Sequence, residues 1–148
     1  MFKSLFNKNE KTENTKYNDN MLAVAAILVE AAYSDENFGK NEKDIIIKIL
    51  KKQFTFDKNA SAEDLVKEAV QSIQSSGDLI TYTRTIKELW AIEKRIEIIE
   101  MMWKVCLIDG VIEPYEDMLI RRIAGLIYVS DKDRKLAKAK AINELKKA

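Results

Sequence analysis

Hydrophobic residues recur along this chain with the spacing of α-helices. In the stretch NEKDIIIKILKKQF, Ile45, Ile46, Ile49 and Leu50 fall on one face and lysines on the other, as in an amphipathic helix. The stretch MLAVAAILVEAAYS is apolar on nearly every side, so we expect that helix in the middle of a bundle. The pattern predicts seven helices, at residues 20–34, 41–54, 62–76, 78–90, 93–109, 114–129 and 131–148.

Signals at the helix starts agree with this pattern. Ser61 with Asp64, and Ser130 with Asp133, are N-cap signatures. Pro114 suits the first position of a helix, where its missing N–H would have no partner. The chain has four glycines and one proline, too few to supply the turns of a sheet protein. We therefore expect an all-α fold, a compact bundle of about seven helices.

Length and composition predict one folded domain with a polar lead-in. The chain has 148 residues, of which 47% are hydrophobic and 33% charged, a balance typical of globular proteins. Residues 1–19 are mostly polar and lack periodicity, which indicates a disordered or loosely docked segment before a helical domain at 20–148. Because no apolar stretch is long enough for a transmembrane helix or a signal peptide, we expect a cytoplasmic protein.

Residue types common in catalytic and transition-metal sites are scarce. Histidine is absent, which removes the commonest general base near neutral pH and excludes the usual Ser-His and Cys-His triads. Cys106 is the only cysteine and lies in the apolar run MMWKVCLID, so we expect a buried thiol. Trp90 and Trp103 are expected in the core rather than in a ligand cage. We therefore predict a non-enzymatic protein.

Charge is unevenly distributed along the chain. Residues 131–148 carry seven basic and three acidic side chains, which leaves residues 21–130 net acidic although the whole chain has a net charge of +1. An acidic core argues against nucleic-acid binding. The basic C-terminal helix suits contact with a protein or with an anionic membrane surface.

An internal repeat appears when the chain is shifted by 74 positions. VEAAYSDENFGKNEKDIIIKIL then lies over WKVCLIDGVIEPYEDMLIRRIA, with Asp35 on Asp109 and Glu42 on Glu116. Each copy is an apolar helix, an aspartate, and a glutamate seven residues later that opens a second helix. We predict a duplicated helix–acidic turn–helix unit whose two apolar helices cross at the centre.

Two interpretations of these acidic turns are open. In the first, the aspartates bond nearby backbone N–H groups and the glutamates cap their helices. In the second, the carboxylates of both turns converge with Glu30 and bind a hard divalent cation such as calcium, magnesium or manganese. A complete calcium loop is excluded, because Val105 and Leu107 stand where oxygen ligands are required. In DLITYTR, Asp78 is expected as an N-cap and Arg84 as a surface cation; the alternative is that Arg84 neutralises the acidic turns or binds a partner carboxylate.

Three stretches resemble the tellurite-resistance TerB family, specifically its stand-alone TerB-like proteins: LVEAAYSDENFGKNE, DLITYTRTI and EIIEMMWKVCLIDGVIEPYEDMLIRRIAGLI. The resemblance implies a compact helical domain with an internal pseudo-twofold and a role in a bacterial cytoplasmic stress response, acting through binding. The family's acidic positions, suggested to bind metal, correspond to Glu30, Asp35, Glu42, Asp109 and Glu116. The first turn departs from the family pattern, with glutamate after Asp35 where glycine is preferred.

Two functions follow from these observations. The first is a binding module that takes a divalent ion at its acidic centre and docks other proteins with its outer faces. The second is a purely structural adaptor without an ion, which uses its basic C-terminal helix to contact protein or anionic membrane.

Overall fold

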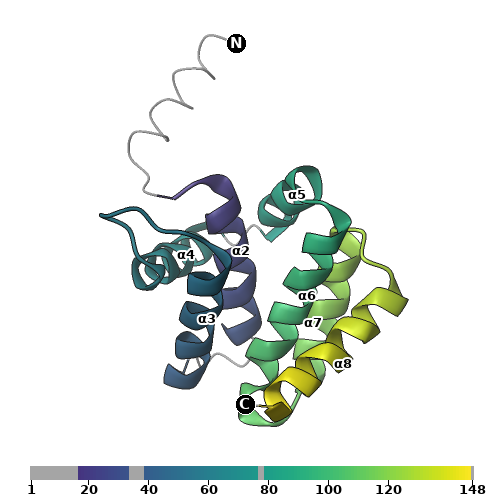
Figure 1. Ribbon diagram of the computed structural model, residues 1–148. Coiled ribbons are helices and arrows are strands. Elements are labelled where there is room, and N and C mark those ends of the chain that lie inside the picture. The colour runs from purple at the N-terminus through teal and green to yellow at the C-terminus, as the bar shows by residue number, and fades with distance from the viewer. Residues whose placement is uncertain (1–16, 34–38, 77–78, 148) are drawn as a thin grey trace.

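Seven α-helices and one short 3₁₀ helix form the described part of the computed structural model (Figure 1). The structure describes residues 17–33, 39–76 and 79–147. No strand occurs in these ranges, so the predicted all-α class is confirmed. The elements are α2 (Asp19–Ala32), α3 (Lys40–Gln53), α4 (Ala62–Ser76), α5 (Leu79–Leu89), α6 (Ile92–Cys106), η2 (Leu107–Asp109), α7 (Pro114–Leu126) and α8 (Asp131–Lys147).

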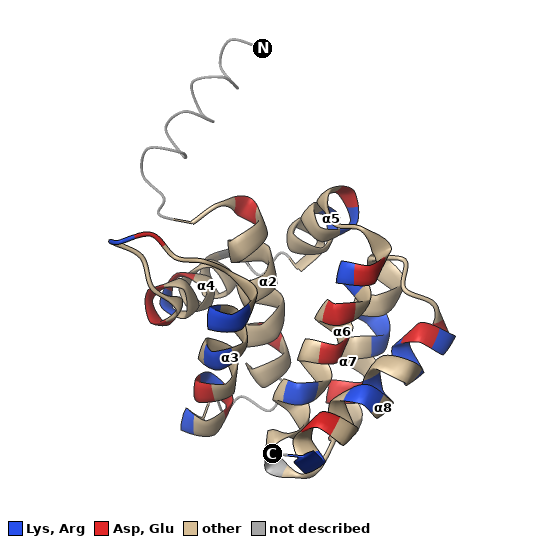
Figure 2. Cartoon of the chain, in the orientation of Figure 1, with Lys and Arg blue, Asp and Glu red and all other residues tan. Residues whose placement is uncertain are grey.

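The helix α3 lies at the surface with one face inward, as its periodicity predicts. Ile46 and Leu50 are fully buried, whereas Lys48, Lys51 and Lys52 are exposed. Figure 2 shows the resulting basic bands on this helix. The amphipathic pattern thus determines which side of α3 meets the core.

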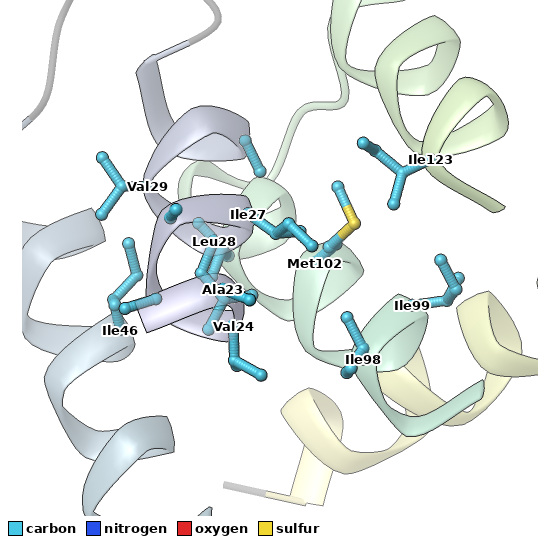
Figure 3. Packing of buried hydrophobic residues seen from close by; sticks show 14 of the residues in the cluster. Ala23, Val24, Ile27, Leu28, Val29, Ile46, Ile98, Ile99, Met102 and Ile123 are labelled. Carbon is cyan, nitrogen blue, oxygen red and sulfur yellow. The ribbon is translucent and has the colours of Figure 1, made fainter. Parts of the chain in front are cut away.

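The apolar helix α2 is at the centre of the bundle. It packs against α3, α4, α5 and α6, and every residue from Ala23 to Val29 is buried. In Figure 3, α2 lies between Ile46 of α3 and Met102 of α6, with Ile27 directed toward Met102. The prediction of a central, all-round apolar helix is confirmed.

The second apolar helix, α6, crosses against α2 and carries α8 on its other side. Trp103 and Cys106 are almost fully buried in it, as predicted. Trp90 lies just before α6, packs against the core and donates its Nε1–H to Asn20 Oδ1 at 3.0 Å. Both tryptophans therefore serve packing.

The predicted caps form. Ser61 Oγ accepts from the N–H of Asp64 at 3.0 Å, and Ser130 Oγ accepts from the N–H of Asp133 at 3.1 Å. Pro114 is the first residue of α7. Each cap satisfies a donor that the first turn of a helix leaves without an intrahelical partner.

The folded domain begins before α2. Residues 1–16 of the predicted lead-in lie outside the described residues. Tyr17, which falls in that predicted segment, is only 5% exposed. Its hydroxyl lies 2.8 Å from Asp64 Oδ2 and accepts from the N–H of Ser61 at 3.1 Å. Asn18 then caps α2 by accepting from Met21 N–H at 2.9 Å.

Arg95 joins the α5–α6 connection to the α7–α8 connection by two hydrogen bonds. Its Nε donates to Trp90 O at 3.0 Å and its Nη1 to Ile127 O at 2.7 Å. The second connection contains Tyr128 at φ 59°, a left-handed position that glycine usually occupies at a helix end. Hydrogen bonds between residues this far apart leave no local signal in the sequence.

Candidate functional site

Glu116 lies at the start of α7 and is used as a cap. It occupies the third helical position after the N-cap, Glu113, and is only 7% exposed. Its Oε1 accepts from the backbone N–H of Glu113 at 2.8 Å. A carboxylate here satisfies a first-turn donor and is favoured by the helix dipole. The capping interpretation is therefore confirmed for Glu116.

Glu42 occupies the same position at the start of α3. The N-cap there is Gly39, which has no side chain to cap with, and Glu42 is third after it. The carboxylate of Glu42 folds back toward the N-cap: its Oε2 lies 2.8 Å from the place where a Cβ on residue 39 would stand. The glycine thus leaves room for the glutamate. Glu42 and Glu116, aligned by the sequence repeat, occupy equivalent places in their helices.

The two aspartates of the predicted ion site cannot be placed. Asp35 and the side chain of Asp109 lie outside the described part of the chain, as does Asp78, the predicted cap of α5. The 3₁₀ helix that ends at Asp109 packs against α3. Within the described ranges, no group of three or more His, Cys, Asp and Glu side chains is arranged to hold a metal ion. The convergence of the two turns on one ion stays a prediction.

Glu30, the candidate ion ligand on α2, forms no ion pair within the described ranges. It is half-buried on α2, and no hydrogen bond or ion pair joins it to a described residue. Lys104 binds other carboxylates, and Arg84 is exposed on α5 without an ion pair to a described side chain. The role of Glu30 as an ion ligand stays a prediction.

A buried charge network joins α6 to α8 instead. Glu100 is only 8% exposed. Lys104 Nζ lies 3.0 Å from Glu100 Oε2 and also contacts Glu144, while Lys140 Nζ lies 3.6 Å from Glu100 Oε1. Figure 2 shows acidic and basic positions alternating where α6 and α8 meet. The sequence signal was the Glu100–Lys104 pair, four residues apart on an otherwise apolar helix face.

The network favours the charged forms of Lys104 and Glu144. Burial opposes the positive charge of Lys104, but hydrogen bonds to Glu144 and Glu100 outweigh it and raise the pKa of the ammonium. The hydrogen bond from Lys104 lowers the pKa of Glu144. Because each charge has an opposite partner, this network stabilises the packing of α8 and leaves no unneutralised carboxylate for a cation.

Comparison with family models decides the affiliation of the chain. The model described as "Tellurite resistance protein TerB" matches residues 21–139. The chain belongs to the TerB family. Comparisons with curated proteins and with solved structures find no match.

The TerB match runs from the start of α2 into α8 and includes both acidic turns. It therefore covers the two apolar helices, Glu42 and Glu116, and the α6 half of the charge network, Glu100 and Lys104. No described helix of this TerB-family chain has the length and apolar character needed to cross a membrane.

Proposed function

We propose that this TerB-family chain is a non-enzymatic binding module of a bacterial cytoplasmic stress response. It binds a divalent cation at its paired acidic turns and docks protein partners with its outer faces. The main support is the equivalent placement of Glu42 and Glu116, each third after an N-cap and each preceded by an aspartate seven residues earlier. Carboxylate oxygens at such turns suit calcium, magnesium or manganese.

Charge repulsion gives the physical reason for a cation. If Asp35, Glu42, Asp109 and Glu116 lie close together, their mutual repulsion disfavours the folded state. A bound cation relieves that repulsion, and it stabilises the fold by mass action because the unfolded chain lacks the site.

Thermal melts in EDTA and in calcium, magnesium or manganese chloride test this proposal. We expect at least one salt to raise Tm in the unaltered chain, and the double variant Asp109→Asn with Glu116→Gln to abolish the rise. Glutamine retains an acceptor at the N3 position, so the double variant removes charge while keeping the cap. Glu93→Gln, an exposed first-turn glutamate of α6, is the matched control and should keep the rise. No rise with any of the three salts would exclude the ion.

The second candidate is a structural adaptor without an ion. It is supported by α8, which the buried network holds against α6 while most of its lysines point outward. Sedimentation with vesicles containing phosphatidylglycerol tests it. Binding that is lost at high salt, with a Tm insensitive to divalent cations, would favour the adaptor over the ion-binding module. The exposed lysines of α8 are Lys132, Lys135, Lys140, Lys146 and Lys147.

A further inference from the structure

A cleft of about 620 Å³ lies between α3 and α4. Its volume is within the range of ligand-binding sites. The residues of α4 that line it run from just before the helix, at Ser61, to Gln71. At 1.5 Å per residue this makes the cleft about 15 Å long. It is thus an elongated groove along a helix.

The acidic side chains of the cleft are already engaged. Glu63 Oε2 lies 3.1 Å from Lys51 Nζ, and a hydrogen bond from its own backbone N–H, followed by the Lys51 ammonium, lowers the pKa of Glu63. Asp64 accepts from the Tyr17 hydroxyl at 2.8 Å. The Lys51 ammonium therefore neutralises Glu63, and the Tyr17 hydroxyl satisfies an oxygen of Asp64.

The two lysines that line the cleft have no ion-pair partner among the described residues. Lys43 on α3 and Lys67 on α4 both line it and both are exposed. No carboxylate in the described ranges forms an ion pair with either of them. The cleft consequently offers positive charge from both of its walls to an anionic ligand.

Apolar surface lies between these lysines. Tyr33, at the end of α2, and Val70 are half-buried and line the cleft, above the fully buried Val66. A ligand that fits both features carries carboxylates for Lys43 and Lys67 and an apolar side chain for Val70 and Tyr33.

We propose that this cleft binds a short, extended, acidic peptide segment of a partner protein. An extended chain rises about 3.3 Å per residue, so the groove takes about four or five residues. A nucleic acid fits less well, since two lysines neutralise few phosphates. The inference rests on the docking part of the proposed function and names the surface and the partner class.

Titration of the ¹⁵N-labelled chain with the acetylated peptide EDLFD tests the site. We expect amide shifts to gather at Lys43, Lys67 and Val70, and the affinity to fall at least tenfold in the double variant Lys43→Glu with Lys67→Glu. The matched control is the double variant Lys48→Glu with Lys58→Glu, which reverses the charge of two exposed lysines that do not line the cleft. It should bind EDLFD as the unaltered chain does. The neutral peptide NQLFN should bind at least tenfold more weakly than EDLFD.

Each outcome has a distinct meaning. If the shifts gather elsewhere, or if the Lys43/Lys67 variant binds EDLFD as tightly as the unaltered chain, the cleft is not the peptide site. Docking at another surface then stays open. Absence of any shift with EDLFD also overturns the cleft as the peptide site. If a ten-nucleotide thymidine strand binds more tightly than EDLFD, and the same variant loses that binding, the ligand of the cleft is a nucleic acid and not a peptide. The ion proposal is judged separately, by the Tm response of the Asp109→Asn with Glu116→Gln variant, which retains Lys43 and Lys67.

Discussion

Glu100 and Glu116 are buried almost equally, to 8% and 7% exposure, but they are compensated in different ways. Glu100 lies between the ammonium groups of Lys104 and Lys140, which bind it from α6 and α8. Glu116 accepts from a backbone N–H, a dipole that carries no net charge. A lysine cancels the charge of a carboxylate, whereas a backbone N–H at a cap satisfies one of its oxygens. Burial alone therefore does not mark a carboxylate as an ion ligand.

The largest effect that sharpens this contrast is expected from Lys104→Met. Removing the ammonium leaves Glu100 buried with only the more distant Lys140, which should lower the free energy of unfolding by about 3 kcal/mol. Urea denaturation measures the loss. Lys94→Met removes one member of an exposed ion pair with Glu97 and should cost less than about 1 kcal/mol. Equal losses in the two variants would show that Glu100 does not depend on Lys104.

A smaller loss is expected at the cap. Glu116→Ala leaves the N–H of Glu113 without its acceptor and should cost about 1.5 kcal/mol. Glu116→Gln keeps the acceptor and should cost less. If the two variants lose the same stability in denaturant titrations, charge rather than capping holds the start of α7.

Acid should weaken the charge network. The pKa of Glu144 is lowered by Lys104, so its contribution is present above the unfolded pKa of about 4.3 and is lost as pH falls through the folded value. The raised pKa of Lys104 places the loss of its contribution at alkaline pH, above its unfolded pKa of about 10.4.

The acid effect should be modest because the side chain of Glu144 is 41% exposed; we expect at most about 1 kcal/mol. Urea titrations between about pH 3 and pH 7 measure it. The variant Glu144→Gln, already without this pair, should lose correspondingly less stability on acidification. An identical pH dependence in both chains would contradict the assigned pair.

The smallest effect is expected at Glu42. This residue has no backbone hydrogen bond in the described structure of the kind that Glu116 makes, so Glu42→Ala should cost only the interaction with the helix dipole, about 0.5 kcal/mol. Comparing its loss of stability with that of Glu116→Ala in the same denaturant titration tests whether the N-termini of α3 and α7 differ. A loss as large as that at Glu116 would mean that Glu42 is an equally strong cap.

The sequence by itself determined the helical class, the centrality of α2 and α6, and the caps at Ser61 and Ser130. These features depend on local periodicity and on hydrogen bonds between residues three or four apart, both of which can be found in one stretch of chain. The sequence repeat, which aligns Glu42 with Glu116, also identified the glutamates at the third position of α3 and α7.

Only the tertiary structure decided which charges meet. Glu144 lies 40 residues beyond Lys104, and Tyr17 bonds a helix start 44 positions away. The same long-range packing brings Lys43 of α3 and Lys67 of α4 to one cleft. Such contacts depend on how two helices are rotated and displaced against each other. The hydrophobic pattern specifies which face of each helix is inward, but not which polar residues at the edges of those faces come within reach.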